Sequence, residues 1–294
     1  MRQKSATVKV GTDRAAGDVA SHTGVMSAVD GPARYVREAF GARGDAWPLS
    51  GGQGIAWAVG DLVLKPDADV RQQEWHGTML NPLRRCGFRL ADAVATRNGR
   101  WVCDGWSATR AVEGEEPSHH ASPRWAEIIE AGRALHRATA SLPRPDFIGT
   151  RDTWWETADR QTWSTTSPDV LPLLQTVSER PRRALTSLGM DQVVHCDLTG
   201  NVLFANGMAP AIIDISPYWR PPAYAEGVVV ADALCWHDAP ASLTDDLGVP
   251  RSAVARALLF RLLTTNTRAA SGVDVEGVRD EARRYELAAD AIGV

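Results

Sequence analysis

The sequence predicts an α+β fold with two lobes, a small lobe rich in β-strands followed by a larger lobe that is mostly helical. Short apolar segments separated by turn residues lie between Trp47 and Trp106, a pattern typical of strands. Beyond about residue 115, apolar residues recur at helical spacing instead. One strand pair around Asn206-Gly207, a strong hairpin signal, interrupts these helices.

Three segments are expected along the 294 residues. Residues 1–30 are rich in Gly, Ala, Ser, Thr and charge without clear periodicity, which predicts a flexible N-terminal tail. Residues 31–108 form the expected strand-rich N-lobe, and residues 109–294 form the expected helical C-lobe. A chain of this length can bury most of its apolar surface without disulfides or structural metals.

Within the N-lobe, the apolar segments 55–59 and 62–64 flank a Gly-Asp turn and predict a β-hairpin. Residues 69–83 predict a helix that is capped by an aspartate and ends near a proline. Residues 88–94 and 100–106 are expected to form two further strands, joined through an Asn-Gly turn. The N-lobe should therefore be a small sheet with one helix.

The C-lobe is predicted to begin with a helix from Ser122-Pro123 to about Pro143, because a capping hydroxyl is followed by proline at the first helical position. A short strand leads into His195, and the segment 202–213 predicts the hairpin. Further helices are expected near residues 154–163, 171–188, 224–237, 251–267 and 275–289.

Composition and charge argue against several classes of protein. The formal net charge is -4 and arginines are scattered among acids, so nothing indicates the basic face of a nucleic-acid-binding protein. The four cysteines do not form a CxxC pair, which disfavours a disulfide framework or a zinc site. The sequence contains no apolar run typical of a signal peptide or a membrane helix. We expect a cytoplasmic protein without nucleic-acid or membrane partners.

The segment from Val193 to Asp214 carries the residues best suited to chemistry. It places His195, Asp197, Asn201 and Asp214 at the ends of short apolar strands, as is typical of sites on a rigid scaffold. An aspartate can accept the proton of an attacking hydroxyl. An asparagine oxygen and a second carboxylate can hold Mg²⁺, a hard cation that prefers oxygen ligands. The pattern favours phosphoryl transfer.

This segment resembles the aminoglycoside phosphotransferase and small-molecule kinase superfamily, which has a protein-kinase-like fold. The matching motifs are His195-Cys196-Asp197-Leu198, Asn201-Val202-Leu203 and Ile212-Ile213-Asp214. The resemblance implies that Asp197 is the catalytic base and that Asn201 and Asp214 are metal ligands. It implies a structural role for His195. More narrowly, the runs HCDLTGNVLF and SPYWRP resemble an actinobacterial kinase-like family.

A glycine-rich segment in the N-lobe is the expected cover of the ATP phosphates. It precedes a strand rather than a helix, which argues against a Walker loop or a Rossmann fingerprint. It fits the glycine-rich hairpin of kinases, where missing side chains let backbone N–H groups approach phosphates. Its residues are Gly51, Gly52, Gln53 and Gly54.

Other residues take their expected roles from the same resemblance. Lys65 ends a predicted strand and is the only lysine after Lys9; its ammonium group is expected to contact the α- and β-phosphates. Glu74, the only glutamate on the following helix, is expected to pair with Lys65. In the C-lobe, Asp232 lies within an apolar helical run and is expected to support the catalytic loop. His136 is expected to pack rather than react.

The sequence therefore predicts an enzyme that uses ATP and Mg²⁺ to phosphorylate a hydroxyl group of a small molecule. Two departures from the family pattern leave an alternative open. Asp197 and Asn201 are four rather than five residues apart, and Cys196 replaces the usual glycine. The alternative is a nucleotide-binding pseudokinase with a regulatory or scaffold role. A protein kinase is disfavoured, because the sequence has no Asp-Phe-Gly motif or activation loop.

Overall fold

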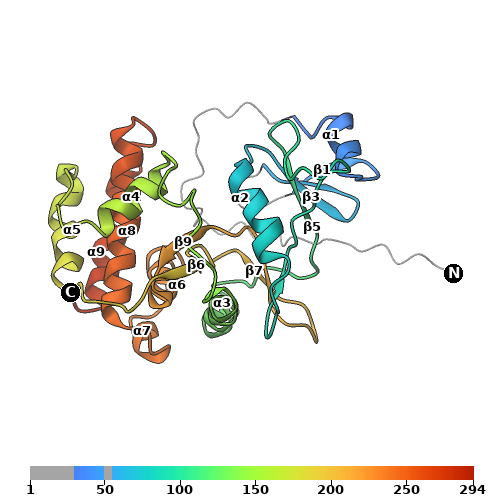
Figure 1. Cartoon of the computed structure of the whole chain (residues 1–294). Helices are drawn as coiled ribbons and strands as arrows, with labels where there is room; N and C mark the ends of the chain where they lie inside the picture. The colour runs from blue at the N-terminus through green and yellow to red at the C-terminus, as the bar shows by residue number, and fades with distance from the viewer. Residues whose placement is uncertain (1–29, 50–54) are drawn as a thin grey trace. The chain divides into compact units, whose positions relative to one another are not determined.

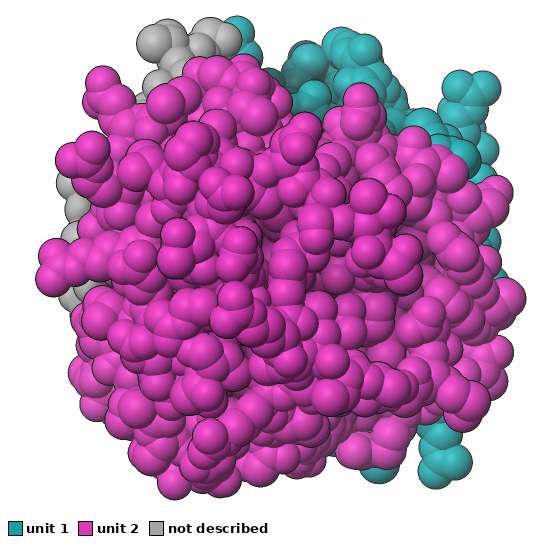
Figure 2. All heavy atoms as spheres, turned by 90° about the vertical axis from the view of Figure 1, so that its left-hand side faces the viewer, with its two compact units in different colours: residues 1–14, 27–117, 200–214 teal, residues 15–26, 118–199, 215–294 magenta. Residues whose placement is uncertain are grey.

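The computed structural model describes residues 30–49 and 55–294 (Figure 1). They divide into a strand-rich unit and a helical unit, and Figure 2 shows the helical unit in magenta. The strand-rich unit consists of the described residues up to Pro117 together with Gly200–Asp214, and the helical unit consists of Ser118–Thr199 and Ile215–Val294. The segment 200–214, expected in the C-lobe, thus groups with the strands by its contacts, while the expected lobe boundary at residue 108 stays a prediction.

A four-stranded antiparallel sheet forms the centre of the strand-rich unit. In spatial order its strands are β1 (Ala46–Pro48), β2 (Trp57–Val59), β3 (Leu62–Lys65) and β5 (Ser107–Arg110). β2 and β3 confirm the predicted hairpin. Gly60 adopts a φ of +63° in its turn, a conformation that glycine reaches without steric cost. Helix α1 (Arg34–Ala39) contributes Val36 to a small apolar core that it shares with buried residues of this sheet.

The predicted strand at 100–106 is wrong, because a tight turn occupies that segment. Asp104 and Gly105 have φ angles of +49° and +75°, and the residues on either side exchange two backbone hydrogen bonds of 2.9 Å. Left-handed backbone angles cannot continue an extended strand. The strand begins at Ser107 instead, where β5 pairs with Lys65 of β3.

The predicted helix at 69–83 begins where expected and then changes its winding. Asp69 caps α2 (Val70–Trp75) by accepting a hydrogen bond of 3.0 Å from a backbone N–H three residues further on. The chain continues as a π-helix, η1 (His76–Leu80). A Cβ atom added to Gly77 would lie 2.3 Å from the indole ring of Trp101. This ring therefore packs directly on the helix backbone where the wider π-turn occurs.

A second sheet explains why the segment 200–214 groups with the strand-rich unit. Strand β8 (Ala211–Ile212) pairs antiparallel with β7 (Val202–Leu203), which confirms the predicted hairpin. On its other side, β8 pairs in parallel with β4 (Arg89–Leu90). The parallel pair joins residues that are distant in the sequence, so the hairpin shares a three-stranded sheet with β4 of the strand-rich unit.

The helical unit is built around two long buried helices. The predicted helices are confirmed near their expected positions, but the first begins at Trp125 without a side-chain cap, so the predicted start at Ser122-Pro123 is wrong. A Cβ atom added to Gly227 would lie 2.4 Å from the carbonyl oxygen of Ala253, so the backbones of α6 (Pro222–Trp236) and α8 (Arg251–Ala270) approach closely. A two-stranded sheet of β6 (Gln192–His195) and β9 (Pro217–Arg220) completes the unit; β9 was not predicted. The helices are α3 (Trp125–Thr139), α4 (Trp154–Thr162), α5 (Pro172–Arg183), α6 (Pro222–Trp236), α7 (Leu243–Asp246), α8 (Arg251–Ala270) and α9 (Val278–Ala291). Among the described helices, none combines the length and apolarity needed to cross a membrane.

Candidate active site

In the strand-rich unit, two strands from separate sheets bring opposite charges together. Lys65 is the last residue of β3, and Asp214 lies two residues beyond the end of β8. The Lys65 Nζ atom lies 2.7 Å from Asp214 Oδ2, and the two side chains are 37% and 52% exposed. An ion pair so accessible to water contributes at most about 1 kcal/mol to stability. Both groups can therefore exchange this contact for a ligand at little cost.

The backbone at Asp214 is unusual for a residue with a side chain. Its φ angle is +50°, a left-handed conformation that costs on the order of 1 kcal/mol and is frequent at active sites. The preceding residue, Ile213, donates its N–H to the carbonyl oxygen of Asn201 at 3.0 Å. This bond holds the backbones of Asn201 and Asp214 on adjoining segments, as two ligands of one metal ion require.

The oxygen donors of Asn201 and Asp214 fit Mg²⁺. This cation is usually bound by one or two carboxylates together with substrate phosphates and water. Within residues 30–49 and 55–294, no group of three or more His, Cys, Asp or Glu side chains could hold a metal ion. A Mg²⁺ ion that is shared with the phosphates of a nucleotide needs no such group. The donor set therefore suits a metal that arrives with its nucleotide.

Two expected nucleotide contacts remain predictions. Glu74 lies on α2 and is exposed. For the part of the chain that the structure describes, the ion pair of Lys65 is with Asp214 and not with Glu74. The glycine-rich segment at residues 51–54 lies outside the described residues.

Asp197 lies in the helical unit, where a buried arginine connects it with Asp232. Arg261 on α8 donates from Nε and Nη2 to the two carboxylate oxygens of Asp232 on α6, at 2.7 and 2.6 Å. The same Nη2 lies 3.5 Å from Asp197 Oδ1. Asp232 is 3% exposed, whereas the side chain of Asp197 is 45% exposed. Asp232, which we expected to support the catalytic loop, thus reaches Asp197 through Arg261.

Arg261 was not among the site residues predicted from the sequence. Burial lowers the pKa of its guanidinium group, but the charge and hydrogen bonds of Asp232 outweigh this effect and raise that pKa well above its ordinary value. The positive charge is therefore permanent. A signal was present in the sequence, because Arg261 interrupts the apolar run Leu-Leu-Phe-Arg-Leu-Leu, and a charge in such a run needs a buried partner.

The buried His195 fixes the backbone just before Asp197. Its backbone N–H donates to His136 Nε2 at 3.0 Å, and its Nδ1 accepts from the backbone N–H of Ser216 at 3.1 Å. Burial lowers the pKa of His136 to about 3, so this imidazole stays neutral and can accept. Burial also raises the pKa of the Cys196 thiol well above its ordinary value. That thiol is therefore protonated and is not a nucleophile.

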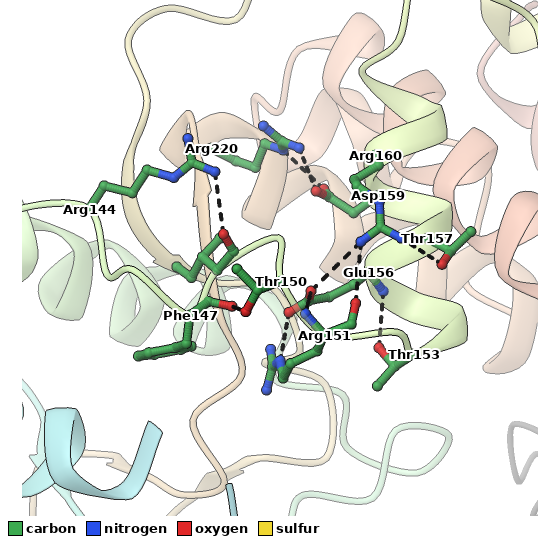
Figure 3. A network of polar contacts seen from close by, with 11 residues as sticks. Arg144, Phe147, Thr150, Arg151, Thr153, Glu156, Thr157, Asp159, Arg160 and Arg220 are labelled. Carbon is green, nitrogen blue, oxygen red and sulfur yellow. Dashed lines mark hydrogen bonds and ion pairs between the residues drawn. The ribbon is translucent and has the colours of Figure 1, made fainter. Parts of the chain in front are cut away.

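A second polar network joins α4 to β9 (Figure 3). Asp159 accepts from Nε of Arg220 at 3.0 Å and also from its Nη2. One turn earlier on α4, Glu156 accepts from Nε and the backbone N–H of Arg151, at 2.6 and 3.0 Å. Glu156 and Asp159 are 4% and 6% exposed, so each buried carboxylate has an arginine partner. The network anchors β9 and, through it, the strand β6 that leads into the candidate catalytic segment.

Comparisons with known proteins identify the fold. No protein-family model matches the sequence, and no curated protein matches it. Solved structures do match. The crystal structure of aminoglycoside phosphotransferase APH(4)-Ia superposes with a TM-score of 0.58 at 16% identity, covering 88% of this chain and 97% of that one. An aminoglycoside phosphotransferase from Alicyclobacillus acidocaldarius gives 0.57 at 13% identity, covering 92% and 95%.

Choline kinase LicA from Streptococcus pneumoniae also matches, with a TM-score of 0.54 at 12% identity over 87% of this chain and 95% of that one. These proteins phosphorylate different acceptors by their names, so the likeness concerns the scaffold. The expected α+β fold class is confirmed, whereas the narrower resemblance to an actinobacterial family stays a prediction. The chain has the protein-kinase-like fold that aminoglycoside phosphotransferases share with choline kinase.

Proposed function

We propose that this protein transfers the γ-phosphoryl group of ATP to a hydroxyl group of a small molecule in a Mg²⁺-dependent reaction. The observation that carries the proposal is the ion pair of Lys65 and Asp214, at 2.7 Å, in the fold of small-molecule kinases. Two structural neighbours support it. A mutant of APH(4)-Ia is described as a ternary complex with AMP-PNP and hygromycin B, and a spectinomycin phosphotransferase as a complex with ADP and spectinomycin.

In this proposal, the strand-rich unit binds the nucleotide. The ammonium group of Lys65 contacts the α- and β-phosphates, and the segment 51–54, which lies outside the described residues, is the proposed cover of these phosphates. Asn201 and Asp214 hold Mg²⁺, which neutralises charge that develops on the phosphoryl oxygens. With Asp214 engaged in holding Mg²⁺, Lys65 would be available to the phosphates, and Glu74 is the proposed partner that would restrain it.

The helical unit supplies the base. We assign this role to Asp197, whose side chain is 45% exposed and is therefore accessible to an acceptor hydroxyl. Asp197 orients that hydroxyl and accepts its proton as the oxygen attacks the γ-phosphorus. Most of the rate enhancement would come from positioning and from charge neutralisation rather than from covalent chemistry.

One observation favours a second candidate, a nucleotide-binding pseudokinase. Only three residues separate Asp197 from Asn201, one fewer than the family pattern expects. Gly200 completes this short loop with a φ of +78°, and a Cβ atom there would lie 3.4 Å from Glu116 Oε1. The loop thus depends on glycine. In this second candidate, the changed spacing between the base and the metal ligand permits nucleotide binding but not phosphoryl transfer.

The substitution Asp197→Asn tests the proposal. It keeps the shape of the side chain but removes the proton acceptor, so turnover of an accepted hydroxyl compound should fall by about 10²–10⁴-fold. The stabilisation of the fold by ATP and Mg²⁺, measured as a shift in melting temperature, should be retained. Wild-type turnover by the variant would remove Asp197 as the base. Nucleotide binding by a wild-type protein that turns over no ATP would support the pseudokinase instead.

A further inference from the structure

We propose that Arg261 is a positioning residue, which fixes the carboxylate of Asp197 in one orientation. The inference rests on the proposed function, since it assigns how the proposed base is held. It goes beyond that function by naming a residue on α8 that contacts neither nucleotide nor acceptor in the proposal.

A buried guanidinium group needs a partner that is equally fixed. The side chain of Arg261 is 10% exposed and that of Asp232 is 5% exposed. Their two-point contact, at 2.7 and 2.6 Å, uses the planar edge formed by Nε and Nη2. This geometry leaves the guanidinium no rotational freedom, because a change of angle would break one of two charge-assisted hydrogen bonds. The pair therefore joins α6 and α8 rigidly.

The second hydrogen of Nη2 gives the pair its further role. A guanidinium Nη2 carries two N–H groups. One of them is directed at Asp232 Oδ2, and Nη2 lies 3.5 Å from Asp197 Oδ1. The position of this donor is set by two buried helices and not by the loop that carries Asp197. The half-exposed carboxylate on the loop is thus held by a donor in the helical core. Because both oxygens belong to one planar group, fixing one of them also sets the direction of the other.

The same helix offers a matched control. Two turns further along α8, Arg268 forms a buried ion pair with Glu281 of α9, in which the side chains are 5% and 9% exposed. Arg268 also lies 3.3 Å from Asp274. This pair has the burial and the charge of the Arg261 pair, but its carboxylate partners lie in the C-terminal part of the helical unit. Loss of either pair should cost similar stability, whereas only Arg261 is placed to influence Asp197.

The experiment compares two double variants of the full-length protein. Arg261→Gln with Asp232→Asn removes the first pair, and Arg268→Gln with Glu281→Gln removes the second. Each double variant removes both charges, so neither leaves an unpaired charge in the core. Turnover is measured at saturating ATP and Mg²⁺, and the titration of the Asp197 carboxyl is followed by carbon-13 NMR. The signal of Asp197 is identified by its loss in Asp197→Asn.

We expect the first double variant to lower kcat by about 10–100-fold with little change in the KM for ATP, because a misplaced base affects the chemical step more than nucleotide binding. The Asp197 carboxyl should titrate at higher pH in this variant, because the loss of the cation that contacts Asp197 outweighs the loss of the Asp232 carboxylate. The Arg268 and Glu281 double variant should match the wild type in both measurements. Equal behaviour of the two double variants would overturn the inference and leave Arg261 a structural residue.

The two readouts also separate this inference from the proposed function. If the wild type turns over neither ATP nor any acceptor, the proposed function fails, and the NMR titration still decides whether Arg261 controls the Asp197 carboxylate. If the wild type is active and the titration of Asp197 is the same in all three proteins, the function stands and the positioning role is refuted.

Discussion

The two units of this chain each contain an ion pair beside candidate functional residues, but the two pairs are built in opposite ways. In the strand-rich unit, Lys65 and Asp214 meet in a single contact and are 37% and 52% exposed. In the helical unit, Arg261 and Asp232 meet through two contacts and are 10% and 5% exposed. The first pair costs little to break, because water can replace each partner. The second cannot be broken without leaving a charge in the core.

The difference matches what each unit has to do in the proposed reaction. A group that must exchange its partner for a phosphate or a metal ion has to be accessible, and a flexible lysine suits this role. A group that holds a base in place must not exchange at all, and the planar arginine suits that role. The contrast therefore separates a binding function in one unit from a positioning function in the other.

The largest expected effect on stability tests this contrast directly. Asp232→Asn removes the negative partner of a buried guanidinium and should lower the free energy of unfolding by about 3–5 kcal/mol. Asp214→Asn removes the partner of a half-exposed ammonium and should change it by at most about 1 kcal/mol. Urea denaturation of the two variants beside the wild type measures both values. Adding Arg261→Gln to Asp232→Asn should restore part of the lost stability, and equal losses for the two single variants would contradict the contrast.

A smaller effect should appear in acid, and here the two units are alike. Burial lowers the pKa of His76 in the strand-rich unit to about 4 and that of His136 in the helical unit to about 3. The unfolded chain, with histidine pKa values near 6.5, therefore binds more protons than the folded chain below that pH. Stability should be complete above about pH 6.5 and decline as the pH falls, by about 2 kcal/mol per histidine at pH 5.

Thermal unfolding between pH 5 and pH 7 measures this loss. His76→Gln and His136→Gln should each flatten the dependence by removing one titrating group, and they should do so in different units. A wild-type protein whose melting temperature is unchanged across that range would show that these imidazoles are already hydrated or paired in the folded state.

The smallest effect on stability is expected at Lys65, together with a large effect on binding. Lys65→Ala should change the free energy of unfolding by less than about 1 kcal/mol in the absence of nucleotide. It should abolish most of the rise in melting temperature that ATP and Mg²⁺ produce in the wild type. Arg110→Ala provides the control, because Arg110 forms an exposed ion pair with Asp61 on the same sheet. A normal nucleotide shift in Lys65→Ala would refute the role of Lys65.

Much of the fold could be predicted from the sequence, because local patterns determine it. The hairpin of β2 and β3 follows from two apolar segments around Gly60, and the start of α2 follows from the cap at Asp69. The strand predicted at residues 100–106 is absent because Asp104 takes a left-handed backbone conformation, which the side-chain pattern does not reveal. The grouping of Gly200–Asp214 with the strand-rich unit depends on the parallel pairing of β4 with β8, and no local signal reports it.

The candidate site shows the same division between local and distant information. The polar residues at strand ends, such as Asp197 and Asp214, stand out in the sequence because apolar runs precede them. Which partner each of them meets cannot be read from the sequence. The contact of Arg261 with Asp197 joins residues 64 apart in the chain, and the ion pair of Lys65 with Asp214 joins two separate sheets. Such pairs depend on packing, which no spacing rule encodes.

The scarcity of lysine gives the strand-rich unit a built-in chemical reporter. Beyond residue 9 the sequence contains one lysine, Lys65, and its Nζ atom lies beside Asp214 at the candidate nucleotide site. A lysine-directed acylating reagent can therefore modify one side chain in residues 10–294. Peptide mass spectrometry would read that modification without any engineered label. A bound nucleotide would protect the same nitrogen, so the rate of acylation measures occupancy of the site in the unmodified protein.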